Sequence, residues 1–153
     1  MHDAINILKQ IRKLTHQTVT GLTHGQYFTI PAGFDNNIAW NIGHIVVVQQ
    51  RLHYKLTGLE PYISPAQMTM FAPGSSPNDW VQLPDILPLL ERLLALPDKL
   101  ETDYAAGKFA NFQPYTTSTG ISIKSMNEAL IFNNYHEGLH FGYIQALKNL
   151  VVG

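Results

Sequence analysis

Residues 125–149 read SMNEALIFNNYHEGLHFGYIQALKN, and the rest of the chain is best interpreted outward from this stretch. Ser125, followed three residues later by Glu128, matches the capping box that marks the N-terminus of a helix. Apolar residues and histidines then recur every three or four positions, which is the spacing of one helix face. The residues on this stripe are Ala129, Phe132, His136, His140, Tyr143 and Leu147. The pattern predicts a long helix with one buried face.

Three other stretches show the same helical spacing of apolar residues. They cover residues 3–22, 36–57 and 83–105. In the first stretch, Ile7 and Leu14 widen the apolar stripe. In the second, Asp35 is the expected N-cap, and the surrounding period favours a helix although Ile45–Val48 is also compatible with a strand. Pro97 lies inside the third stretch and is expected to kink or break that helix.

Two long linkers, residues 59–79 and 107–124, separate the later helical stretches. A linker of this length in a compact domain usually crosses the fold or covers a site. Four long helices predict an all-α protein built as a four-helix bundle. The short first connection and the longer later ones favour crossovers over a simple up-and-down order. We expect residues 1–153 to form a single domain.

Composition excludes several classes of function. Hydrophobic residues make up 45% of the chain, charged residues 14%, and the net charge is −1, which argues against nucleic acid as a partner. The chain has no cysteine, so a cysteine nucleophile, a disulfide and an iron–sulfur cluster are excluded. No apolar run is long enough to span a membrane and no signal pattern opens the chain, so we expect a soluble cytoplasmic protein. The low charged fraction and the many Leu and Ile residues favour a homodimer.

His136 and His140 are one helical turn apart and lie about 40° apart around the helix axis, so both can face one ion. His44, on the apolar side of the second predicted helix, is the candidate for a third ligand. The pair His136 and His140 is equally compatible with hydrogen-bonded core residues, and His44 alone is better explained as a core histidine, but the three together are better explained by a metal. His53 falls on the opposite side of its helix and is excluded. The remaining histidines, which are expected in solvent, are His2, His16 and His24.

The string from His136 to His140 also matches H-E-x-x-H, the signature of zinc proteases. No His, Asp or Glu follows His140 to serve as the third ligand, so Glu137 is interpreted as a flanking or supporting residue rather than a general base. Gly138 and Gly142 each cost helix stability, and we favour close helix packing over room for a ligand as the reason. Two aromatic residues are candidates for the substrate pocket, although core packing also accounts for the first: Trp40 and Tyr143.

Two segments resemble motifs of the DinB/YfiT-like superfamily. They are residues 36–45, NNIAWNIGHI, and residues 135–142, YHEGLHFG, although Tyr143 replaces the Gln that many relatives carry. The resemblance extends over the order and length of the helices. It implies an up-down-down-up bundle, often dimeric, that holds a divalent metal, commonly zinc or nickel. The implied ligands are His44, His136 and His140. The superfamily includes thiol-dependent transferases and isomerases that use bacillithiol or mycothiol.

Three functions are compatible with such a site. The leading hypothesis is a metal-dependent transferase that takes a small-molecule substrate and a low-molecular-weight thiol as cosubstrate, of the bacillithiol S-transferase type. A metal-dependent hydrolase is the second, since a bound metal can also activate water. The third is a non-catalytic, metal-stabilised dimeric or ligand-binding module. A cavity that reaches the metal favours an enzyme, whereas a site without a channel favours the module.

Overall fold

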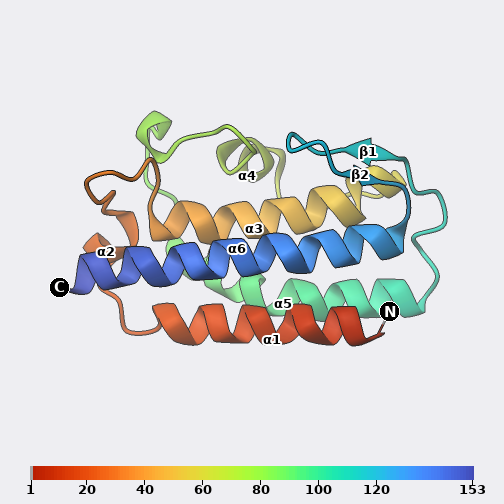
Figure 1. Cartoon of the computed structure of the whole chain (residues 1–153), viewed down its shortest axis with the longest axis horizontal. Helices are drawn as coiled ribbons and strands as arrows, with labels where there is room; N and C mark the ends of the chain where they lie inside the picture. Colours follow the sequence, from red (N-terminus) through yellow and green to blue (C-terminus); the bar gives the residue numbers. More distant parts are fainter. Residues whose placement is uncertain (1) are drawn as a thin grey trace.

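Figure 1 shows the computed structural model, which describes residues 2–153. The long elements are α1 (His2–Val19), α3 (Ile38–His53), α5 (Ile86–Ala105) and α6 (Met126–Val152). Both α1 and α3 pack against α5 and α6, so the core lies between these helices. The all-α prediction is confirmed, since strand structure in the described residues is limited to one small hairpin. No helix in the described part of the chain is long and apolar enough to cross a membrane.

Short elements occupy the connections. They are α2 (His24–Phe28), η1 (Lys55–Thr57), α4 (Pro65–Met70), η2 (Pro77–Asp79), β1 (Tyr115–Thr116) and β2 (Ser122–Ile123). The two strands form an antiparallel hairpin in which Tyr115 pairs with Ile123. Figure 1 shows α4 and this hairpin on the same side of the molecule, next to α3. Both predicted linkers therefore contain ordered structure.

The helix ends differ from the sequence predictions by a few residues. Asn37, not Asp35, is the N-cap of α3, and its side chain accepts a hydrogen bond from the backbone of Trp40. The capping box predicted at Ser125 is half formed: Ser125 accepts from the backbone of Glu128, but the Glu128 carboxylate accepts from the backbone of Lys124. These shifts leave the candidate histidines on the predicted helices.

The helix α3 is the centre of the fold. Every one of its residues is buried except Arg51, including the β-branched run 45–48 that was compatible with a strand. On α1, by contrast, Ile7 and Leu14 do not widen the buried stripe, because their exposed fractions are 51% and 48%. Arg12 and Thr15 are fully buried on that helix instead. The prediction for Ile7 and Leu14 was wrong because the buried stripe of α1 is narrower than expected and includes Arg12, which belongs to a buried ion pair.

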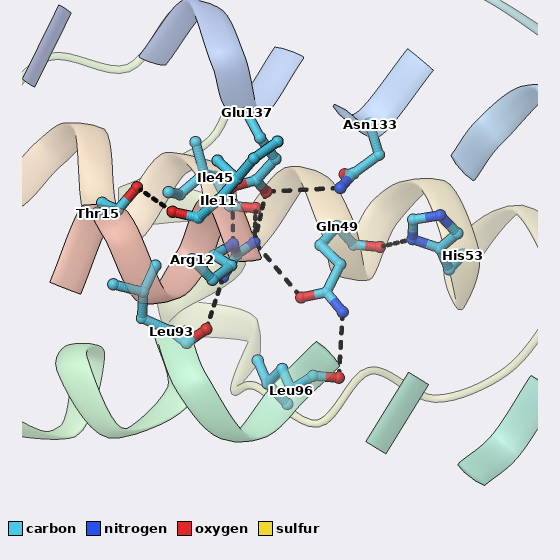
Figure 2. A network of polar contacts seen from close by, with 10 residues as sticks. All are labelled: Ile11, Arg12, Thr15, Ile45, Gln49, His53, Leu93, Leu96, Asn133 and Glu137. Carbon is cyan, nitrogen blue, oxygen red and sulfur yellow. Dashed lines mark hydrogen bonds and ion pairs between the residues drawn. The ribbon is translucent and has the colours of Figure 1, made fainter. Parts of the chain in front are cut away.

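That ion pair joins Arg12 of α1 to Glu137 of α6, as Figure 2 shows. The Arg12 guanidinium donates to the two Glu137 carboxylate oxygens at 2.6 and 2.7 Å, and to the carbonyl oxygen of Ile45 at 2.9 Å. Gln49 of α3 lies within 3.5 Å of the same guanidinium and donates to the carbonyl of Leu96 on α5. All four long helices are thus tied together at one buried point.

The same network explains why α5 continues through Pro97 as one helix. The predicted break is therefore wrong, whereas the alternative of a kink stays a prediction. Proline has no backbone N–H, so the carbonyl of Leu93, four residues earlier, lacks its helical partner. The Arg12 guanidinium lies 3.5 Å from that carbonyl and supplies a donor from α1. A helix–helix contact therefore compensates for the missing bond within the helix.

Candidate metal centre

The structure brings His44, His136 and His140 together from two helices. One potential ligand atom from each residue lies within 4.8 Å of those of the other two. The ring centroids are 4.4 Å apart for His136 and His140, and 5.1 and 4.8 Å from that of His44. Three imidazole nitrogens that converge in this way can hold one divalent transition metal and leave a coordination position open.

His44 is oriented by a backbone carbonyl. Its Nδ1 lies 2.9 Å from the carbonyl oxygen of Phe71, which can only accept, so Nδ1 carries the proton and Nε2 keeps its lone pair. Gly43 makes this contact possible, because a Cβ atom there would lie 2.3 Å from the Phe71 ring. The Phe71 ring thus lies directly on the α3 backbone, one residue before the candidate ligand.

His140 is oriented by Asn41. Its Nδ1 lies 2.7 Å from the Asn41 side-chain oxygen. The Asn41 amide nitrogen donates to the Asn37 carbonyl and to the Asn36 side-chain oxygen, both at 2.8 Å, and this turns its oxygen toward the imidazole. The proton again lies on Nδ1 and leaves Nε2 free, as is usual for histidine ligands held by a second residue.

Asn41 was not among the predicted site residues. It lies three residues before His44 on the same helix, so the same-face spacing was available as a signal.

His136 differs from the other two histidines because its Nδ1 is buried without a hydrogen-bond partner among the described residues. The pKa of His136 is lowered to about 2, mainly by burial and also by the neighbouring His140 and His44. Burial also lowers the pKa of His140 to about 3 and lowers that of His44. All three rings are therefore neutral at ordinary pH, which a metal requires of imidazole. The unpartnered nitrogen and the neutral donor set fit a metal ion.

The other histidines stand apart from this cluster. His53 is fully buried and its Nδ1 donates to the carbonyl of Gln49. His24 is exposed and His16 is half-buried. The side chain of His2 lies outside the described part of the chain.

The two aromatic candidates for the pocket lie in different surroundings. Trp40 stacks on His44, with ring centroids 4.5 Å apart and planes inclined by 12°, and its indole N–H donates to Ser75. Tyr143 packs edge-on against Phe34 at 5.3 Å and is 37% exposed. Neither is among the residues that line the cavity at the histidines.

Gly138 and Gly142 do not serve close helix packing within the chain, as had been favoured. A Cβ atom at either position meets nothing within 4 Å. Both lie on the exposed side of α6. The expectation was wrong because no other helix that the structure describes approaches α6 at these two positions.

A cavity of about 440 Å³ reaches His44 and His136. This is within the usual range for small-molecule sites. Its walls come from α3, η1, α4, the β1–β2 hairpin and α6, and its charged residues are Arg51 and Lys55. The sequence prediction missed these two cations, although both follow His44 along one helix face at near-helical spacing. The part of the hairpin that closes the cavity is Tyr115, Thr117 and Ser118.

Glu137 is neither a flanking residue nor a general base. It is fully buried, and both carboxylate oxygens accept hydrogen bonds from Arg12. A carboxylate paired in this way is not available to take a proton from water at the histidines. The H-E-x-x-H match is therefore a coincidence of spacing: its two histidines face the cluster and its glutamate faces the interior.

The model of the DinB superfamily matches residues 7–144 of the chain. No curated protein matches the chain.

Proposed function

Because the chain belongs to the DinB superfamily, we propose that it binds one divalent transition-metal ion, zinc or nickel, through His44, His136 and His140. The observation that carries the proposal is the convergence of three neutral imidazoles, two of them with Nδ1 held by Phe71 and Asn41. Imidazole is a good ligand for both metals. The arrangement of the helices supports this site, since His44 lies on the most buried helix of the fold.

We further propose that the protein is an enzyme, not a passive metal-stabilised module. The support is the cavity of about 440 Å³ that His44 and His136 line, since a purely structural site is closed to solvent and small molecules. When bound, a divalent metal held by neutral ligands lowers the pKa of a coordinated thiol or water. The chain's own residues orient the ligands, and apolar side chains such as Val48 and Leu52 form part of the cavity wall.

The reaction we favour is the transfer of a low-molecular-weight thiol to an electrophilic small molecule. A carbon–sulfur bond forms, the thiol proton goes to solvent, and the electrophile loses its leaving group or takes up a proton. The chain has no cysteine, so the sulfur must come from a cosubstrate.

Metal content tests the first proposal. We expect about one equivalent of zinc or nickel in the purified protein, and loss of most of it in His44→Ala, His136→Ala and His140→Ala. His24→Ala is the matched control, because this histidine is exposed and is not part of the cluster. Circular dichroism establishes that each variant is folded. Full metal retention in all three site variants contradicts the proposal.

Thiol transfer is tested by following conjugate formation between cysteine or glutathione and 1-chloro-2,4-dinitrobenzene. We expect the metal-loaded protein to exceed the uncatalysed rate, and the metal-free protein and His140→Ala not to do so. Rates equal to the uncatalysed reaction with several thiols contradict transfer. Ester or amide hydrolysis by the metal-loaded protein then identifies a hydrolase, and the lack of both activities identifies a binding module.

We also propose that the long helices form an up-down-down-up bundle and that the protein is a homodimer. The colour gradients in Figure 1 support the first point, since α1 and α6 run in one direction and α3 and α5 in the other. Exposed apolar residues on α6 support the second: Ile131, Tyr135, Leu139 and Leu150.

A further inference from the structure

The cavity at the histidines carries net positive charge. Arg51 and Lys55 line it, one helical turn apart, and no aspartate or glutamate among the described residues does so. Neither cation forms an ion pair with any residue that the structure describes. Arg51 is also the one residue of α3 that is not buried, so its guanidinium is available to a ligand. Two unpaired cations beside a concave surface attract an anion and hold it by charge-assisted hydrogen bonds.

The remainder of the cavity is mostly apolar. Val48, Leu52 and Leu56 of α3 and η1 form one wall, and Met68 and Phe132 contribute from α4 and α6. Along the chain, Val48 lies between His44 and Arg51, whereas Leu52 and Leu56 lie next to the two cations. An anion such as free phosphate or sulfate would leave these apolar side chains uncovered. A ligand with an apolar body would bury them and gain binding free energy from the apolar area removed from water.

The spacing along α3 sets the length of such a ligand. Arg51 follows His44 by seven residues, which is about two turns, or about 10 Å along the helix axis. An anionic group at Arg51 and a reacting group at His44 are therefore separated by about the length of a phenylbutyl chain.

We propose that this cavity binds a small amphipathic carboxylate, with its anionic end at Arg51 and Lys55 and its apolar body directed toward His44 and His136. The proposal deepens the function proposed above, and rests on it for the statement that the end near the histidines is the reacting end. Arg51 and Lys55 act as specificity-determining residues: they select the charge and set the orientation of the ligand.

Binding of matched probes tests the proposal without reference to turnover. The probes are 4-phenylbutyrate, its uncharged isostere 4-phenylbutyramide, and butyrate, which lacks most of the apolar body. Isothermal titration calorimetry of the purified protein, with its metal content measured, gives each affinity. We expect 4-phenylbutyrate to bind about tenfold more tightly than the amide, and butyrate to bind more weakly than 4-phenylbutyrate. Equal affinities for the carboxylate and the amide overturn the proposal.

Two variants test whether Arg51 and Lys55 recognise the negative charge of the carboxylate. Arg51→Gln and Lys55→Gln are each expected to reduce the affinity for 4-phenylbutyrate several-fold toward that of the amide, and to leave the affinity for the amide unchanged. Lys13→Gln removes the same charge from an exposed position on α1 and is the matched control. If the two cavity variants behave like Lys13→Gln, the proposal is wrong.

A carboxylate can also bind directly to a metal, so all titrations are repeated on metal-free protein. Preference for the carboxylate that persists without metal and disappears in Arg51→Gln and Lys55→Gln supports the proposal. If the preference for the carboxylate disappears when the metal is removed but is unchanged in the two variants, the carboxylate binds to the metal. That result overturns the proposal. A protein that never binds metal contradicts the proposed function but leaves the comparison of carboxylate and amide intact, so the two failures are distinguishable.

Discussion

The fully buried pair of Arg12 and Glu137 shows how a single residue controls the interior of this protein. Glu137→Gln keeps the shape and polarity of the side chain but leaves the Arg12 charge buried without compensation. We expect a loss of about 3–5 kcal/mol in the free energy of unfolding, measured by urea denaturation. Lys9→Gln is the control: it removes partly exposed ion pairs to Asp98 and Glu101, and is expected to cost about 1 kcal/mol or less.

The same variant separates the structural role of Glu137 from a catalytic one. We expect Glu137→Gln protein that remains folded to keep its metal and a measurable part of any metal-dependent activity. Complete loss of turnover by folded, metal-loaded Glu137→Gln would restore Glu137 as a general base.

Because of the buried His53, we expect the free energy of unfolding to depend on pH. The pKa of His53 is lowered from 6.5 to about 4, mainly by burial, while the hydrogen bond to Gln49 opposes this shift and the charge of Arg12 adds to it. Between these two values the unfolded chain binds a proton that the folded protein does not, so stability falls as pH decreases from about 6.5 to about 4. The expected slope is about 1.4 kcal/mol per pH unit.

His53→Asn removes this proton and should flatten the dependence of stability on pH by that amount. Urea denaturation of both proteins at several pH values between 7 and 5, with metal removed, gives the two slopes. The clustered histidines contribute equally to both proteins, so only the difference between the slopes is interpreted. Identical slopes exclude His53 as the source.

At the level of single residues, the sequence predicted the contacts that depend on local spacing. His136 and His140 converge because four helical residues make about one turn. Arg12 was not predicted to be buried, because arginine is almost always exposed unless it is paired, and its partner lies 125 residues away. No local pattern contains a pair that distant.

Replacing a glycine by alanine is expected to have opposite effects on stability in α3 and in α6. A Cβ atom on Gly43 would lie 2.3 Å from the Phe71 ring, whose backbone carbonyl holds His44. We expect Gly43→Ala to displace Phe71, to cost about 1–3 kcal/mol of stability and to weaken metal binding. A Cβ atom on Gly138 meets nothing, so Gly138→Ala should stabilise α6 by about 1 kcal/mol and leave metal binding unchanged. Thermal denaturation and metal titration of both variants check this, and a Gly43→Ala protein as stable as the wild type contradicts it.

The long helices were predictable because each contains several periods of its apolar pattern. The short helices α2 and α4 were not, since five or six residues are too few to show a period. Their signal lay in the caps instead. Thr23 with Gln26, and Ser64 with Gln67, form the two capping boxes of the short helices. Residues 59–79 contain one of these boxes, and Phe71 from the same segment orients His44.

For the whole molecule, the exposed face of α6 predicts self-association. Ile131, Tyr135 and Leu139 follow one another at intervals of four residues and are 59%, 56% and 54% exposed. Monomeric proteins rarely leave such a continuous apolar surface in water. We expect a homodimer in sedimentation velocity at micromolar concentration, and a monomer for Leu139→Glu. Leu87→Glu is the control, because that residue is 65% exposed on α5. A monomeric wild-type protein contradicts the prediction.

The distance along the chain between Arg12 and Glu137 also bears on the order of events during synthesis. When the ribosome has released α1, α3 and α5, the guanidinium of Arg12 still lacks its carboxylate partner, which belongs to the last helix. Burial of that charge without a partner is unfavourable, so the first three long helices should remain loosely associated until α6 emerges. Completion of the interior and assembly of the three histidines then coincide, and a nascent chain that lacks α6 should be sensitive to proteases over its whole length.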